Sequence, residues 1–265
     1  MKFSVVLSTQ PSSFSALAYK GNVAENIAKI KSYGYDGVEL AVRDPALLDY
    51  DFLSSLLNQH NLPVPALGTG QAYVEEKLSF TDPKQEVREL ALARIKSQAM
   101  LASKLNAMVI IGLVRGTRGA QVDVETVERW LVDALRECAV ANSNVRFAIE
   151  PINRYETNLV NTVQSGLQLL EKVDKKNVGL LLDTFHMNIE EVSITESIRA
   201  ARDSLFHFHV ADSNRWYPGA GHIDFGTILR ALEEIEYSGF VSAEILPLPD
   251  SDMAAKHAIE YLRAL

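Results

Sequence analysis

The chain has 265 residues, 47% of them hydrophobic, and its 34 acidic side chains outnumber 26 basic ones to give a formal net charge of −8. This length suits one large domain or two small ones, and the acidic balance argues against a broad nucleic-acid surface, which needs clustered lysine and arginine. No apolar stretch could span a bilayer, and no signal-peptide pattern follows Met1. The single Cys138 fits a reducing cytosol. We therefore expect a cytoplasmic protein that binds neither nucleic acid nor membrane.

Strand-like and helix-like segments alternate along the chain. Short apolar runs predict buried strands, and apolar residues recurring every three or four positions predict helices. The strands are expected at residues 3–7, 37–40, 64–67, 108–111, 147–150, 178–182, 205–208 and 240–243. The helices are expected at residues 22–33, 51–60, 83–105, 122–141, 163–173, 194–201, 225–236 and 254–262. Between the third strand and the third helix, residues 68–70 (GTG) predict a flexible turn.

This alternation is the (β/α)8 pattern. A doubly wound open sheet is the alternative, but it would carry a glycine-rich phosphate turn after the first strand, where this chain has residues 8–13 (STQPSS). No linker, low-complexity tract or charge block divides the chain. We therefore predict an α/β protein with one domain over residues 1–265, a (β/α)8 TIM barrel. The active site of such a barrel lies at the carboxyl ends of the strands.

Four of the later strands end in a residue that can bind a metal ion. Glu150 follows an apolar run and precedes a proline, which cannot donate a strand hydrogen bond. Asp183, His209 and Glu244 close the next three strands, at intervals of about 30 residues, the length of one β–α repeat. A single acid at a strand end is often a helix cap, but four such residues in register would converge at one mouth of the barrel. Oxygen and nitrogen ligands suit a divalent ion, so the sequence predicts a metal site on these four residues.

Other polar residues near the strand ends have more than one interpretation. His207 shares a face with His209, one layer deeper, where a hydrogen-bonded core histidine is favoured over a ligand. Glu39 can contact substrate or metal-bound water, or serve as a cap or ion pair. Arg115 and Arg118 follow the fourth strand and can receive a substrate phosphate, since guanidinium matches phosphate geometry; ordinary arginines of a solvated loop are the alternative.

Five elements of sequence carry a family resemblance. They are EPINRYE at 150–156, DTFHMNIEE at 183–191, HVADSNR at 209–215, PGAGHIDF at 218–225 and Glu244. Together they resemble the xylose-isomerase-like TIM barrels, and among these the ketose 3-epimerase branch, related to D-tagatose 3-epimerase and the sugar-phosphate isomerase/epimerases. The resemblance runs from residue 150 to the C-terminus in its motifs and over the whole chain in element order.

The resemblance implies a metal-dependent isomerase of carbohydrate metabolism that acts on a small sugar or sugar phosphate. It places the metal on the four strand-end residues already identified, and the ion is usually manganese, with cobalt or magnesium as alternatives. It places substrate contacts on Glu156, His186 and Arg215. Relatives of this kind are commonly dimers or tetramers, so a homo-oligomer is expected.

Epimerisation beside a ketone removes a proton from carbon and returns one to the opposite face. A divalent ion on the carbonyl and neighbouring hydroxyl oxygens would stabilise the enediolate. Glu150 and Glu244 follow strands five and eight, so they can act in turn as base and acid on the two faces. Arg215 and His186 would donate hydrogen bonds to the developing oxyanion, and Glu156 would hold Glu150 or a substrate hydroxyl.

Three rival functions remain at this point. An aldose–ketose isomerase of the hydroxypyruvate or inosose type would use the same ligands to move a proton between C1 and C2. A nuclease of the endonuclease IV type shares the architecture but needs more histidine ligands, and the early strand ends at residues 68–70 and 112–114 carry none. A non-catalytic sugar-binding relative is disfavoured by the complete set of ligands and acid/base candidates.

Overall fold

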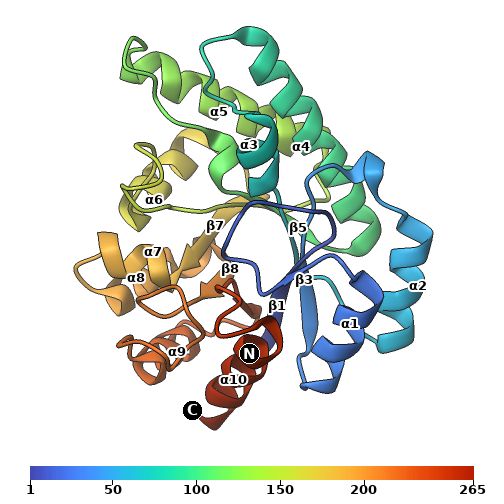
Figure 1. The fold of residues 1–265 in the computed structure, drawn as a ribbon. Helices are drawn as coiled ribbons and strands as arrows, with labels where there is room; N and C mark the ends of the chain where they lie inside the picture. Colours follow the sequence, from blue (N-terminus) through green and yellow to red (C-terminus); the bar gives the residue numbers. More distant parts are fainter.

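The computed structural model describes residues 1–265, and eight parallel strands close into a barrel within it (Figure 1). These strands are β1 (Lys2–Ser8), β3 (Gly37–Ala41), β4 (Ala66–Gly68), β5 (Met108–Ile111), β6 (Phe147–Ile149), β7 (Val178–Asp183), β8 (Leu205–Val210) and β9 (Phe240–Ala243). Each pairs with the next in chain order, and β9 pairs with β1 to close the cylinder. The structure therefore confirms the predicted TIM barrel.

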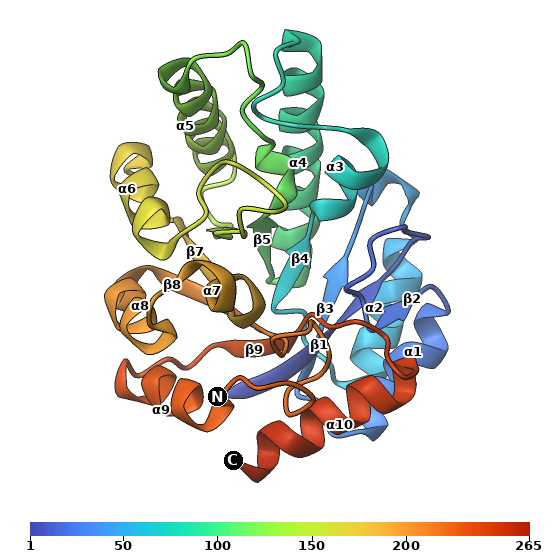
Figure 2. The same ribbon diagram turned by 60° about the vertical axis from the view of Figure 1, so that its left-hand side comes forward.

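Helices form the outer ring around these strands (Figure 2). The ring contains α1 (Val23–Ser32), α2 (Tyr50–His60), α4 (Gln85–Leu105), α5 (Val124–Ala141), α6 (Val163–Val173), α8 (Ile194–Ala201), α9 (Phe225–Glu234) and α10 (Ser251–Ala264). Two shorter helices, α3 (Gly70–Glu76) and α7 (Thr184–Glu190), follow β4 and β7, and 3-10 turns occupy Pro45–Leu47, Leu113–Arg115 and Arg202–Ser204. No helix is both long enough and apolar enough to cross a bilayer.

Three short elements, β2 (Tyr19–Lys20), α3 and α7, differ from the sequence prediction, which placed no helix over the residues of α7. The extra strand β2 pairs with the end of β1, and two residues are too few to leave a recognisable pattern. Residues 68–70 were expected to be a flexible turn, yet helix α3 begins at Gly70. In this helix Ala72 is buried and Gln71 donates a hydrogen bond of 2.6 Å to the Ser8 hydroxyl. Packing across the barrel mouth, rather than local sequence, therefore stabilises α3.

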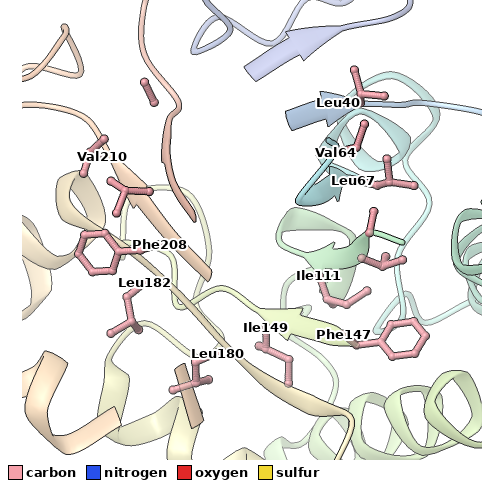
Figure 3. Packing of buried hydrophobic residues seen from close by; sticks show 14 of the residues in the cluster. Leu40, Val64, Leu67, Ile111, Phe147, Ile149, Leu180, Leu182, Phe208 and Val210 are labelled. Carbon is pink, nitrogen blue, oxygen red and sulfur yellow. The ribbon is translucent and has the colours of Figure 1, made fainter. Parts of the chain in front are cut away.

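The hydrophobic core has an outer and an inner part. Figure 3 shows side chains of the outer part, among them Leu182, Phe208 and Val210, which belong to the large cluster between the strands and the helices. The inner part fills the barrel itself and consists of Ala66, Met108, Ile110, Ala148 and Leu181. Since side chains alternate along a strand, Asp183 points inward like Leu181. The alternation therefore places the last polar residues of the strands inside the carboxyl end of the barrel.

Candidate metal centre

Four side chains from consecutive strand ends meet at the mouth of the barrel. Glu150 follows β6, Asp183 ends β7, His209 lies near the end of β8 and Glu244 follows β9. One ligand atom from each lies within 4.8 Å of all the others. The structure thus brings together the four residues that the sequence predicted as a metal site.

The chemistry of these atoms fits a divalent cation. Oε1 of Glu150 and Nδ1 of His209 are buried and have no hydrogen-bond partner in the protein, and Oδ2 of Asp183 has only an ion pair with Arg215. A buried polar atom without a partner is unfavourable, so this group of atoms is adapted to something other than protein donors. Three carboxylates and one imidazole form a donor set suited to ions such as Mn²⁺, Co²⁺ or Mg²⁺.

Asp183 uses one carboxylate oxygen as a helix cap and leaves the other for the candidate metal site. Its Oδ1 accepts a hydrogen bond of 2.8 Å from the Phe185 N–H, which caps helix α7. Its Oδ2 remains directed at the cluster. Glu150 has room beside it because residue 112 is glycine; a Cβ there would lie 2.9 Å from Glu150 Oε2. Local structure therefore orients both carboxylates.

The protein raises the pKa of two of the three carboxyl groups and lowers that of the third. Burial, followed by the charge of Glu244, raises the pKa of Glu150 to about 8. Burial also raises the pKa of Glu244 to about 7, although Arg215 opposes this. Burial disfavours ionised Asp183 as well, but Arg215, the two nearby histidines and the Phe185 N–H together lower its pKa. A bound cation would hold all three carboxylates ionised, so its binding would release protons.

Arg215 lies between two of these acids. Its Nη1 is 3.0 Å from Asp183 Oδ2, and its Nη2 donates to Glu244 Oε2. The residue has a φ of 64°, which is uncommon for any residue but glycine. The turn is built around the buried carboxylate of Asp212, which accepts hydrogen bonds from the main-chain N–H groups of Ser213, Gly219 and Ile223. Asp212, which the sequence analysis did not single out, thus supports the loop that directs Arg215 into the site.

Glu39 lies between the two histidines of β8. Its Oε2 is 2.7 Å from Nε2 of His207, and its Oε1 is 3.0 Å from Nε2 of His209. Since a carboxylate accepts, both imidazoles donate from Nε2, which leaves Nδ1 of His209 facing Asp183 at 3.8 Å. Burial disfavours the charge on both partners, yet the imidazoles lower the pKa of Glu39 and the nearby acids raise that of His209 to about 10. Of the open interpretations, Glu39 is therefore an ion-pair partner and His207 a hydrogen-bonded core residue.

The residues expected to contact substrate lie beside Glu150. Nε2 of His186 is 3.6 Å from Glu150 Oε1, and burial lowers the pKa of His186 to about 3, so its ring is neutral. Asn153 connects His186 to Glu156, with its Nδ2 2.7 Å from His186 Nδ1 and 2.8 Å from Glu156 Oε1. Sequence reasoning missed Asn153; the available signal was a polar residue within the same short motif as Glu150 and Glu156.

A cavity opens at this cluster. Glu150, His186 and Glu244, which follow the later strands, lie on its polar side, together with Glu39 of β3. Its apolar side comes from the first strands and the loop after β1, with Val6, Phe14, Leu17 and Ala41 in one small cluster. That loop crosses in front of the barrel in Figure 1, and Ser12 and Ser13 bind Glu75 of α3. No lysine or arginine lines the cavity.

Arg115 has a different role from either one that the sequence suggested. Its side chain is fully buried, and its guanidinium donates to four main-chain carbonyl oxygens, those of Gly112, Glu150, Leu159 and Val160. It is therefore neither a solvated arginine nor free to bind phosphate, because its donors join the loops after β5 and β6. Arg118 is half-buried and reaches Val122 O at 3.4 Å; its phosphate role stays a prediction.

Comparison with known proteins identifies similar chains. Residues 27–265 match the family described as xylose isomerase-like TIM barrel. The chain is 34% identical over 223 residues to L-ribulose 3-epimerase from Methylomonas sp. (strain DH-1), a match covering 82% of this chain and 76% of that one. It is 38% identical over 246 residues to a probable ketose 3-epimerase from Synechocystis sp., covering 89% and 83%. The crystal structure of D-allulose 3-epimerase from Methylomonas sp. with D-allulose has a TM-score of 0.83 at 27% identity, covering 100% of this chain and 98% of that one.

Proposed function

Since the chain belongs to the xylose isomerase-like TIM barrel family, we propose that it is a metal-dependent ketose 3-epimerase, an isomerase that inverts the configuration at C3 of a ketose. One observation carries the proposal beyond family membership. The four strand-end donors converge within 4.8 Å, several of their ligand atoms are buried without a hydrogen-bond partner, and they open onto a cavity.

The resident cofactor in this proposal is one divalent ion, with Mn²⁺ preferred over Co²⁺ and Mg²⁺. Glu150, Asp183, His209 and Glu244 would hold it. When bound, the ion supplies Lewis acidity that makes a C–H bond beside the substrate carbonyl more acidic. Its charge would also keep Glu150 and Glu244 ionised, the form in which a carboxylate can accept a proton.

Proton transfer is assigned to Glu150 and Glu244. They follow the fifth and eighth barrel strands, with Asp183 and His209 between them, so a substrate in the cavity can meet one carboxylate on each face. One glutamate removes the proton from C3 and the other returns a proton to the opposite face, with the roles exchanged in the reverse reaction. Neutral His186 and cationic Arg215 would donate hydrogen bonds to the oxygen on which negative charge develops.

The substrate in this proposal is a free ketose rather than a ketose phosphate. No lysine or arginine lines the cavity, so away from the proposed metal centre it offers no cationic side chain to hold a terminal phosphate. The apolar side around Phe14 and Leu17 suits the less polar part of a sugar chain. A phosphate contact at Arg118 is the alternative, and a ketose phosphate turned over better than its free ketose would favour it.

The proposal is tested by proton exchange with solvent. A panel of ketoses and ketose phosphates is incubated with the Mn²⁺-loaded protein in deuterated water, and deuterium is located by NMR. We expect uptake at C3 of a free ketose, and loss of uptake in Glu150→Gln and Glu244→Gln. Uptake confined to C1 or C2 would instead indicate an aldose–ketose isomerase, and near-native exchange in either variant would contradict the paired-glutamate scheme.

Other expectations from the sequence are carried forward as parts of this proposal. A dimer or tetramer is checked by light scattering of the purified chain, and a cytoplasmic location by fractionation of cells. Incision of abasic DNA by the metal-loaded protein would revive the nuclease alternative. Tight sugar binding without any exchange would revive the non-catalytic one.

A further inference from the structure

The side-chain amide of Asn153 is held in one orientation by its neighbours. Its Oδ1 lies 3.0 Å from the main-chain N–H of Tyr155, a group that can only donate. Its Nδ2 lies 2.8 Å from Oε1 of Glu156, a carboxylate oxygen that accepts. Reversing the amide would place two acceptors together and two donors together. The NH₂ group therefore points towards Glu156.

The same NH₂ group determines the tautomer of His186. The second hydrogen of Asn153 Nδ2 is directed at Nδ1 of His186, 2.7 Å away, so that nitrogen must accept. A neutral imidazole carries a single N–H, and the proton of His186 therefore lies on Nε2. This nitrogen is on the cavity side, 3.6 Å from Oε1 of Glu150. The ring thus presents a donor to the place where the reaction is proposed to occur.

We propose that Asn153 is a positioning residue that keeps His186 as an Nε2–H donor for a substrate oxygen. This inference rests on the proposed epimerase function. In the opposite tautomer, Nε2 would turn a lone pair towards both the Glu150 carboxylate and the oxygen that gains negative charge, and all three would repel. Asn153 is buried at 1% exposure, so its polar contacts are made with protein groups and not with solvent.

One short segment carries the proposed base Glu150, the positioning residue Asn153 and the expected substrate contact Glu156. Glu150 and Glu156 lie at the two ends of the EPINRYE motif, and Asn153, between them in sequence, donates a hydrogen bond to Glu156. The segment is itself fixed, because Asn161 Nδ2 donates to the carbonyl of Ile152 at 2.7 Å. The position of the His186 donor is therefore linked to that of the proposed base through a single loop.

Asn153→Asp tests the proposal because it exchanges the NH₂ donor for an oxygen acceptor with little change in size. We expect the ring proton of His186 to move to Nδ1. We also expect kcat to fall about 10²- to 10³-fold, as for the loss of one donor to a developing oxyanion, with a smaller change in KM. Asn158→Asp is the matched control, since Asn158 is exposed in the same loop and contacts only the main chain of Arg118.

The tautomer is read from ¹⁵N chemical shifts of labelled histidine in the metal-free chain, a measurement independent of catalysis. A native His186 with its proton on Nδ1 overturns the proposal even if Asn153→Asp fails to fold. An Asn153→Asp variant with native kcat and native tautomer also overturns it. A native chain that exchanges no ketose contradicts the proposed function, and the native tautomer then decides the positioning role by itself.

Discussion

His209 uses its two ring nitrogens for different partners. Nε2 contacts Glu39, whereas Nδ1 has no protein partner and faces the carboxylates of Asp183 and Glu244 at 3.8 Å and 3.9 Å. In metal sites, the partner of the non-coordinating nitrogen fixes the orientation of the ring and increases its basicity. Glu39 occupies that place here, and the fully buried His207 donates to its other oxygen.

Glu39→Gln should therefore weaken the metal centre while leaving the fold intact. The amide has one acceptor oxygen and an NH₂ group that opposes one of the two imidazole donors, so His209 loses its fixed orientation. We expect the affinity for Mn²⁺, measured by titration calorimetry, to fall about 10- to 100-fold. His207→Gln is the control, because its amide can still donate to Glu39, and a smaller loss is expected.

Glu39, His207 and His209 also have the residue types of a second metal site. Their 2.7 Å and 3.0 Å separations are instead those of hydrogen bonds. Two Mn²⁺ ions per native chain, with one lost in Glu39→Gln, would show that the cluster is a metal site. Native affinity in that variant would refute the orienting role of Glu39.

At the scale of elements, Arg115 joins two loops that carry the site. It lies at the end of the 3-10 turn Leu113–Arg115. Its guanidinium donates to main-chain carbonyl oxygens of the loop after β5 and of the loop after β6. One of these carbonyls belongs to Glu150, so the arginine also fixes the main chain of a proposed ligand. Burial lowers the pKa of Arg115 to about 10, which still leaves it charged at neutral pH.

Arg115→Lys should destabilise the protein although the charge is kept. An ammonium group lacks the planar fork of guanidinium and leaves buried carbonyls unpaired, so the free energy of unfolding should fall by about 2 to 4 kcal/mol. Arg118→Lys, three positions away and half-buried, should change it by less than about 0.5 kcal/mol. Urea denaturation compares the two, and equal midpoints would show that Arg115 does not join the loops.

These elements also show what the sequence could and could not predict. The long helices and the strands were predictable because their periodicity is local. The convergence of the four strand-end residues was predictable because parallel strands align their carboxyl ends. Helix α3 depends on contacts such as Gln71 to Ser8, which local sequence does not contain. Arg115 and Asn153 were missed or misassigned for the same reason, since their partners come from segments joined only by the fold.

At the scale of the whole molecule, the site should make the protein less stable without metal. Glu150, Asp183 and Glu244 converge in a buried region, and an ion that binds only the folded chain stabilises it by mass action. At 100 times its dissociation constant, the gain is about 2.7 kcal/mol. Cys138 can report this effect, because it is buried and burial raises the pKa of its thiol to about 12. Its thiol therefore reacts with an alkylating reagent mainly when the chain opens.

We expect Mn²⁺ to slow the alkylation of Cys138 by iodoacetamide relative to the same sample with chelator. The slowing should be greater at pH 8.5 than at pH 6. At the lower pH, protons on Glu150 and Glu244, whose pKa values are about 8 and 7, compete with the ion; above both values this competition ends. At each pH, the rate with chelator is divided by the rate with Mn²⁺. The titration of the thiol affects both rates equally and therefore cancels in this ratio. A ratio of one throughout would contradict metal-linked stability.

Part of the cavity wall comes from a loop that is remote in the chain from the proposed reaction machinery. Phe14 and Leu17 lie in the loop after β1, whereas the proposed acid, base and metal ligands all follow residue 149. Substitutions at Phe14 or Leu17 can therefore change how a sugar fits while every proposed ligand keeps its identity.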